Sequence, residues 1–360
     1  MAKREKCTLG DIAREVNVSP ATVSMILRGT PGMRFSEETV RRVSEAADAL
    51  GYRKSSAKGT FDRPTIAVIV PYITGGYYSF IAQSITQQAN ARGADTIILE
   101  THRSAERESR ILSSLMRMGV AGAIFTARPI NESLTVRTAQ RLPVVIISNK
   151  PQDLPLDSVT TDDYRVGTMI ADYLLALGHR NVAFIEIGRQ RQGIAISQRL
   201  LAVQDRFRAR PDAKLTVYSM PAPDTLRPGS FIETREMARK TSAECLKDPD
   251  LTAFICISDY CAYGVMEALS ERDLRVPEDY SLCGLDDMFP SSLPGVRLTT
   301  IDRHPIEIGA SSLDLLWQRI TSPALPTLTH VTRVEYLSTL IDRGSCASPR
   351  TEPKIAPDGA

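Results

Sequence analysis

The chain has 360 residues, of which 42% are hydrophobic and 24% charged, and its formal net charge is +2. This length allows two or three domains, and the composition is that of a globular protein rather than a disordered or fibrous one. No run approaches the ~20 apolar residues of a membrane-spanning helix, and the basic start lacks the apolar core of a secretory signal. The six cysteines show neither Cys-x-x-Cys nor zinc spacing, so we expect reduced, mostly buried thiols in a cytoplasmic protein.

The charge is unevenly distributed along the chain. Residues 1–63 hold 12 Lys+Arg and 8 Asp+Glu, a net charge of +4. The remainder holds 32 and 34, a net charge of −2. A small basic head on a nearly neutral body favours a polyanionic partner for the head.

Three short helices are predicted in the head. Apolar residues recur at helical spacing in 9–16, and Ser19 is placed to cap a second helix over 20–28. Ser36 is placed to cap a third helix, which Gly51 ends. Two short helices joined by three or four residues and braced by a third form a helix-turn-helix unit.

The second helix, with the sequence PATVSMILR, has an uncharged outer face. Val23, Ile26 and Leu27 share its apolar face, and the opposite face shows small groups beside Met25. A helix that lies against base edges in the major groove cannot carry bulky acidic residues there. The pattern therefore favours a DNA-reading helix, and a three-helix cap with a plain surface is the alternative.

Apolar, β-branched runs alternate with helical stretches through the body. The runs lie at 65–71, 94–100, 120–125, 142–148, 177–187, 251–258 and 279–286. Strands this apolar are covered on both faces, so we expect parallel sheets flanked by helices. Their number exceeds one open sheet, which indicates two α/β subdomains with a cleft between them. Residues 52–64 are polar and basic and are predicted to be the linker from head to body.

Catalytic motifs are nearly absent from the sequence. It has no dinucleotide fingerprint, P-loop or His-Glu-x-x-His motif, and the Ser-x-x-Lys of SSAK lies in the linker without its partner motifs. His179 follows a helix-ending glycine, where a cation would meet the helix dipole. The pair Asp286–Asp287 follows a strand but has no further metal ligands nearby. We therefore expect no enzyme, no cofactor and no metal site.

The order of helix-turn-helix, basic linker and paired α/β subdomains resembles the lactose-repressor (LacI/GalR) family of transcription regulators. The resemblance covers residues 8–345. It rests on the segments TLGDIAREVNVSPATVS, SEETVRRVSEAADALGYR, IAVIVPYITGGYYSFIAQSI, VAGAIF, LPVVIISNK, SVTTDDYRVGTMIADYLLALGHRNVAFI, LTAFICISDYCAYGVMEAL, RVPEDYSLCGLDD, LTTID and LIDRGS.

The resemblance implies an N-terminal all-α helix-turn-helix headpiece at 1–52 and a linker or hinge at 53–64. It implies an α/β body at 65–345 that is similar to periplasmic binding proteins and holds an effector between two subdomains with parallel sheets. The N-terminal subdomain is expected at about 65–177 and 304–322, and the C-terminal subdomain at about 178–303 and 323–345. Residues 346–360 are expected to form a disordered tail.

For the headpiece, the resemblance implies a recognition helix at 20–28 whose Pro20, Ala21 and Met25 face bases. The positions that match phosphate-contacting residues are Thr8, Ser19, Thr22 and Ser24. Arg28 and Arg53 complete the implied DNA-contacting set.

For the body, the resemblance implies an effector site. Tyr77 matches the aromatic that packs on the effector, Asp162 an acidic residue of the N-terminal subdomain, and Arg199 the arginine that reaches the effector. The polar positions that line the same cleft are Ser258, Asp286 and Arg303. An aromatic face with carboxylates and an arginine suits a sugar. For each residue the alternative is a satisfied ion pair or a helix cap.

The sequence departs from the family pattern at several positions. Met25 stands where arginine is frequent and cannot make a bidentate contact to guanine. Gly75–Gly76 replaces the usual Asn-Pro after the first strand, and Ala202 replaces a glycine. The linker is about three residues short, with Gly59 where an alanine-rich hinge helix would run and Phe61 as its only apolar wedge. These linker features put a hinge-helix mechanism in question.

We expect a cytoplasmic, repressor-type DNA-binding regulator under the control of a small-molecule effector such as a sugar, polyol or nucleoside. It is expected to bind palindromic double-stranded operator DNA as a homodimer, because one small head makes too few contacts for useful specificity. It is expected to have no membrane partner. The alternative is a small-molecule binding protein or a sugar-processing enzyme with an appended head, against which the missing signal peptide and catalytic motifs weigh.

Overall fold

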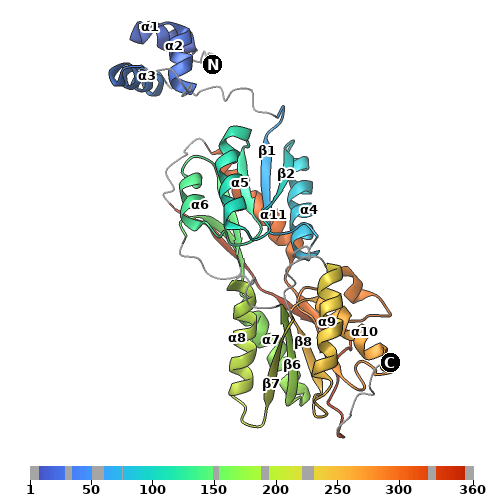
Figure 1. Cartoon of the computed structure of the whole chain (residues 1–360). Helices are drawn as coiled ribbons and strands as arrows, with labels where there is room; N and C mark the ends of the chain where they lie inside the picture. Colours follow the sequence, from blue (N-terminus) through green and yellow to red (C-terminus); the bar gives the residue numbers. More distant parts are fainter. Residues whose placement is uncertain are drawn as a thin grey trace. The chain divides into compact units, whose positions relative to one another are not determined.

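The computed structural model describes residues 8–28, 35–50, 61–74, 76–148, 154–187, 194–220, 231–322 and 330–352. The chain divides into two compact units, the head at Met1–Asp62 and the body at Arg63–Ala360. Figure 1 shows the head in dark blue and the body in lighter blue through red. Each unit has its own buried core, so the two are described separately.

The head is the predicted three-helix unit. Its helices are α1 (Leu9–Val16), α2 (Pro20–Arg28) and α3 (Glu37–Ala49). Its core consists of Ile12, Ala13, Val16, Val23, Val43, Ala46 and Ala47. Ser19 Oγ accepts from the Thr22 amide at 3.0 Å, and Ser36 Oγ accepts from the Thr39 amide at 3.2 Å, so both predicted N-caps are confirmed.

The first subdomain of the body is built on a six-stranded parallel sheet in the order β11–β5–β4–β3–β1–β2. Its strands are β1 (Thr65–Val70), β2 (Asp95–Glu100), β3 (Gly122–Phe125), β4 (Val144–Ser148), β5 (Asp157–Thr161) and β11 (Arg333–Tyr336). Its helices are α4 (Gly76–Ala91), α5 (Ala105–Met118), α6 (Glu132–Ala139) and α11 (Pro305–Thr321). Helices α4 and α11 pack together against one face of this sheet (Figure 1).

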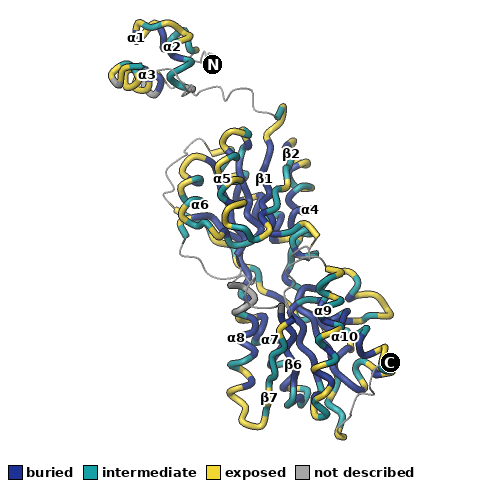
Figure 2. Tube along the Cα trace, viewed as in Figure 1, coloured by how far each residue is buried: buried dark blue, intermediate teal, exposed yellow. Residues whose placement is uncertain are grey.

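The second subdomain is built on a four-stranded parallel sheet in the order β7–β6–β8–β9. Its strands are β6 (Asn181–Ile187), β7 (Lys214–Met220), β8 (Ala253–Cys256) and β9 (Ser281–Cys283). Its helices are α7 (Asp163–Leu177), α8 (Ile194–Arg208), α9 (Phe231–Cys245), α10 (Asp259–Ser270) and the 3₁₀ helix η2 (Phe289–Ser292). Figure 2 shows the central strands of both sheets buried beneath their helices, which confirms the predicted layering.

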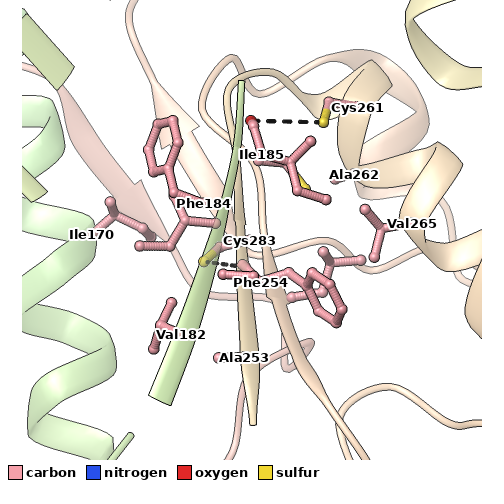
Figure 3. Close-up of a cluster of buried hydrophobic side chains, with 14 of the residues drawn as sticks. Ile170, Val182, Phe184, Ile185, Ala253, Phe254, Cys261, Ala262, Val265 and Cys283 are labelled. Atoms are coloured by element: carbon pink, nitrogen blue, oxygen red, sulfur yellow. Dashed lines mark hydrogen bonds between the residues drawn. The ribbon is translucent and has the colours of Figure 1, made fainter. Parts of the chain in front are cut away.

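Cysteines contribute to the core of the second subdomain. In Figure 3 the Cys261 thiol approaches the carbonyl of Ile185 at 4.0 Å, and the Cys283 thiol donates to the carbonyl of Phe254 at 3.3 Å. Burial raises the pKa of the Cys283 thiol. The five described cysteines are free and buried, which confirms the expectation of reduced core thiols for this part of the chain.

The expected subdomain boundaries need two corrections. The expected bounds place helix α7 in the first subdomain, but Val166, Ile170 and Leu174 pack in the core of the second. They place strand β11 in the second subdomain, but it pairs with β5 in the first sheet. Tertiary packing decides both cases. A helix that lies between two sheets in the sequence can cover either one, and an edge strand such as β11 can pair with either sheet. Outside these two sheets, β10 (Thr300–Asp302) and β12 (Thr339–Ile341) form a two-stranded antiparallel sheet.

The expectation of a disordered tail is wrong for residues 346–352. Cys346 is buried, and the Ala347 amide donates to Ser281 Oγ at 3.0 Å. Arg350 donates to the carbonyls of Leu251, Asp279 and Pro249 at 2.7, 3.1 and 2.8 Å. One arginine that donates to three carbonyls in the segments leading into β8 and β9 holds this part of the tail against the subdomain. Residues 353–360 lie outside the described residues.

His179 does not serve as a cation at a helix end. Its ring is buried, with Nδ1 2.8 Å from Thr252 Oγ1 and Nε2 2.9 Å from both Ser281 Oγ and the carbonyl of Ala347. Burial lowers its pKa to about 4. The imidazole is therefore neutral at pH 7 and joins three segments that are distant in sequence.

Candidate functional site

Over residues 20–27, helix α2 presents a surface without charged side chains, as its sequence predicted. Val23 is buried, while Pro20 and Ala21 are exposed and Met25 is half-buried. No acidic residue lies in the first turn of the helix. This face can approach a polyanion without charge repulsion and offers methyl and hydroxyl groups to a groove.

Three of the four hydroxyl residues matched to phosphate contacts, Thr8, Ser19 and Thr22, lie at helix starts. Thr8 forms a capping box with Asp11, whose Oδ2 accepts from the Thr8 amide and Oγ1 at 2.7 Å each. Ser19 Oγ lies 2.8 Å from Thr22 Oγ1, and Ser24 is half-buried on the same helix. The Arg28 side chain, Arg53 and the linker glycine Gly59 lie outside what the structure describes.

The body contains a buried cluster of two arginines and two aspartates. Arg199 donates to Asp163 Oδ1 at 3.2 Å, and its Nη1 lies 4.0 Å from Asp286 Oδ1. Arg303 lies 3.5 Å from Asp163 Oδ1 and donates to Asp286 Oδ1 at 3.4 Å. Burial opposes the charge of Arg303, but Tyr77, Asp163 and Asp286 outweigh it and raise its pKa. The structure thus brings together three of the predicted residues and adds Asp163.

Tyr77, in the first turn of α4, completes this cluster. The Arg303 guanidinium carbon lies 4.1 Å from the Tyr77 ring centroid, a cation–π contact. Burial raises the pKa of Tyr77 to about 12. Within the described part of the chain, buried donors without a hydrogen-bond partner include Tyr77 Oη, Arg199 Nε, and Nε and Nη2 of Arg303. Such groups are costly in a protein interior and suit a ligand that presents oxygen acceptors.

Two other predicted residues act as helix caps. Asp162 accepts from the Arg165 amide at 3.0 Å at the start of α7. Ser258 accepts from the Cys261 amide at 3.3 Å at the start of α10. Asp162 follows a strand of the first sheet and begins a helix of the second subdomain, so it lies at the junction rather than within the N-terminal subdomain.

Sequence reasoning missed Asp163 and Asp259. Asp259 is fully buried and accepts from Ser291 Oγ, Thr300 Oγ1 and the amides of Asp286 and Met288 at 2.5–3.1 Å. Burial and the neighbouring Asp286 carboxylate raise the pKa of Asp259. Asp259 therefore fixes the loop that carries Asp286. Each missed residue directly follows a helix cap at the carboxyl end of a strand, which is the signal that could have found it.

The described residues offer neither a metal-ligand cluster nor a membrane-spanning helix. No group of three or more His, Cys, Asp or Glu side chains there could hold a metal ion. Asp287 instead pairs with Arg343 at 2.6 Å. No helix among these residues is long and apolar enough to span a bilayer.

Family models match nearly the whole described chain. Residues 8–55 match bacterial regulatory proteins of the lacI family. Residues 63–221 match the periplasmic binding proteins and sugar binding domain of the LacI family. Residues 171–346 match a periplasmic binding protein-like domain. The chain belongs to the LacI family. This LacI-family protein therefore combines a helix-turn-helix region with a periplasmic-binding-protein-like body.

Curated relatives of this LacI-family protein are transcription regulators. It is 28% identical over 315 residues to the HTH-type transcriptional regulator DegA of Bacillus subtilis, covering 85% of this chain and 89% of DegA. It is 27% identical over 318 residues to catabolite control protein A of Priestia megaterium, covering 86% and 91%.

Solved structures agree with this fold. A LacI family transcriptional regulator from Enterococcus faecalis with bound ribose has a TM-score of 0.67 and 25% identity, covering 79% of this chain and 100% of that one. The complex of the transcriptional regulator CelR with cellobiose has a TM-score of 0.62 and 21% identity, covering 94% and 100%. The second likeness concerns the fold alone.

Proposed function

We propose that this LacI-family regulator is a repressor that binds a palindromic operator as a homodimer and responds to a sugar-like effector in its body. The observation that carries the proposal is that one chain has both an uncharged helix face in its head and a buried arginine–aspartate cluster in its body. Because a chromosomal operator is its target, we place it in the cytoplasm. We assign it no catalytic role.

In the head, we assign the base-facing positions to Pro20, Ala21 and Met25. We assign phosphate contacts to Thr8, Ser19, Thr22 and Ser24, with Arg28 and Arg53 as flanking cations. Support comes from the exposed, uncharged surface of α2 and from the match of this region to lacI-family regulators.

For the homodimer, an exposed apolar surface on the second subdomain offers a contact. Phe231 packs on Tyr260 with ring centroids 5.2 Å apart, and Tyr260 packs on Tyr263 at 5.7 Å. Tyr263 in turn bonds the 3₁₀ helix η2, where Phe289 is 68% exposed. A surface of this kind on a globular protein suits association with another copy. Phe289→Asp is expected to lower the mass measured by light scattering from dimer to monomer.

For the effector, we propose a sugar or related polyol that contacts Tyr77, Arg199, Asp286 and Arg303. The donors of the two arginines that have ion-pair contacts but no hydrogen-bond partner suit hydroxyl oxygens as acceptors. The Enterococcus faecalis relative with bound ribose supports this class. We assign Asp162 and Ser258 a part in this site through the helices that they cap, which begin next to Asp163 and Asp259.

The test is a gel-shift series with DNA from upstream of the chain's own gene. Wild-type protein is expected to shift one fragment specifically at physiological salt, and Ala21→Glu is expected not to shift it. The same series with sugars, after a thermal-shift screen, tests the effector. A folded wild-type protein that binds no upstream fragment above its affinity for random DNA would overturn the proposal.

A further inference from the structure

One methionine of the second subdomain lies in the core of the first. Met288 follows the loop after β9, yet its side chain is only 2% exposed and packs in the cluster that contains Tyr77 and Ile81 of α4. Its amide donates to Asp259 Oδ2 at 2.8 Å, so the start of α10 fixes its backbone. A side chain anchored in one subdomain therefore inserts into the other.

Gly76, the first residue of α4, makes room for this methionine. A Cβ atom at position 76 would lie 2.4 Å from Met288 Sδ and 3.2 Å from Tyr260 Oη, where ordinary contact begins at 3.4 Å. Gly76 does not have a left-handed φ, so backbone conformation does not require glycine here. The close approach of the Met288 side chain is what requires a residue without a Cβ atom at this position. Gly76, the second glycine of the unusual Gly-Gly after the first strand, thus lies at a contact between the subdomains.

Arg303, which lies between β10 and α11, strengthens the same contact between the subdomains. Its guanidinium covers the ring of Tyr77 at 4.1 Å and reaches Asp286 of the second subdomain at 3.4 Å. Tyr77 keeps only 9% of its surface exposed. A sugar that packs on this face of the ring and the Arg303 guanidinium cannot occupy it at the same time.

We propose that Gly76, Tyr77, Tyr260, Met288 and Arg303 form a clasp that holds the two subdomains together without effector. The clasp is a conformational device built into the body, because all of its contacts are made by the chain itself. An effector that uses the ring of Tyr77 has to open it. Only this last statement rests on the proposed function.

The test measures the distance between the subdomains in the ligand-free full chain. Spin labels at Met116→Cys on α5 and Lys240→Cys on α9, both exposed positions, report on the two subdomains in a Cys7→Ser background. Burial of the other five cysteines protects them from labelling. Gly76→Ala is expected to shift the main distance to longer values and broaden it, because Met288 and Tyr260 have to give way.

Two controls separate the clasp from a general effect of substitution. Gly295→Ala is the matched glycine control, since a Cβ there meets nothing within 4 Å, and it is expected to leave the distance unchanged. In a Met288→Ala background, Gly76→Ala is expected to add much less to the shift, because the methionine with which it collides is gone. Met288→Ala alone is expected to broaden the distribution, which keeps the test decisive if Gly76→Ala unfolds.

The clasp is overturned if Gly76→Ala and Met288→Ala both give the wild-type distance distribution. It is also overturned if Gly76→Ala lengthens the distance equally with and without Met288. Operator titration of the same variants distinguishes failure of the clasp from failure of the proposed function. If the clasp and the proposed function both hold, Gly76→Ala changes effector-free operator affinity by about fivefold or more. If the distance shifts but no variant, wild type included, binds an operator, the clasp stands and the proposed function fails.

Discussion

The head and the body carry their chemistry in different ways. In the head, eight to thirteen consecutive residues of each helix determine both the buried face and the surface offered to a partner. In the body, the charged cluster joins Asp163, Arg199, Asp286 and Arg303, which the chain brings together from four separate segments. The head can therefore be altered one residue at a time, whereas a change in the body cluster leaves buried charges without partners.

The largest expected effect comes from removing a single carboxylate of the body cluster. Asp163→Ala leaves two buried arginines to share Asp286 and is expected to lower the free energy of unfolding by about 3–5 kcal/mol. Its neighbour Asp162 caps α7, so Asp162→Ala is expected to cost about 0.5–2 kcal/mol. Urea unfolding followed by the fluorescence of Trp317 measures both. Equal losses would mean that Asp163 has no special role in the cluster.

The next effect breaks the head without touching its core. Ala21→Glu is expected to weaken specific operator binding by about 100-fold or more, since a carboxylate then faces bases and phosphates. Its helix content is expected to stay that of wild type, because Ala21 is exposed. Ser44→Glu, at an exposed position of α3, is the matched control and should bind nearly normally. Unchanged operator affinity in a folded Ala21→Glu protein would remove α2 from the interface.

A substitution that adds a contact to a base tests the same DNA interface. Met25→Arg is expected to favour guanine at one operator position by about 1–3 kcal/mol, through a bidentate contact that methionine cannot make. Selection of binding sites from a randomised operator library measures the change. If the preferred base stays the same at every position, then residue 25 does not face base edges.

The smallest effect concerns pH and the body alone. The pKa of His179 is lowered to about 4 in the fold, against an ordinary value of 6.5, so the unfolded chain takes up its proton first as pH falls. Stability from this residue is full above pH 6.5 and is lost progressively toward pH 4. Between pH 7 and 5.5 the expected loss is about 1 kcal/mol. His179→Gln should flatten this part of the urea-unfolding profile, and an unchanged slope would contradict the assignment.

The sequence predicted what depends on neighbours along the chain. The three head helices, the caps at Ser19 and Ser36 and the parallel apolar strands all follow from spacing over a few residues. It did not predict features that need distant partners. His179 was expected to be a cation because its neighbours suggested a helix end, but Thr252 and Ser281 bury it.

Adjacent carboxylates show the same limit within the site. Asp162 and Asp163 are indistinguishable by composition, and the resemblance selected Asp162. In the structure the first caps α7 and the second meets the arginines, because one step around a helix start turns a side chain by about 100°. Likewise, the close approach of Met288 explains Gly76, and nothing near Gly76 in the sequence indicates it.

In the proposed function, a ligand at the arginine–aspartate cluster of the body controls DNA binding by the head. Operator titration of wild-type and Arg199→Ala proteins, with and without the sugar that most stabilises the wild type in a thermal-shift screen, measures this coupling. We expect that sugar to change the wild-type dissociation constant by about fivefold or more and to leave Arg199→Ala unaffected. A folded Arg199→Ala protein that responds like wild type would contradict the account.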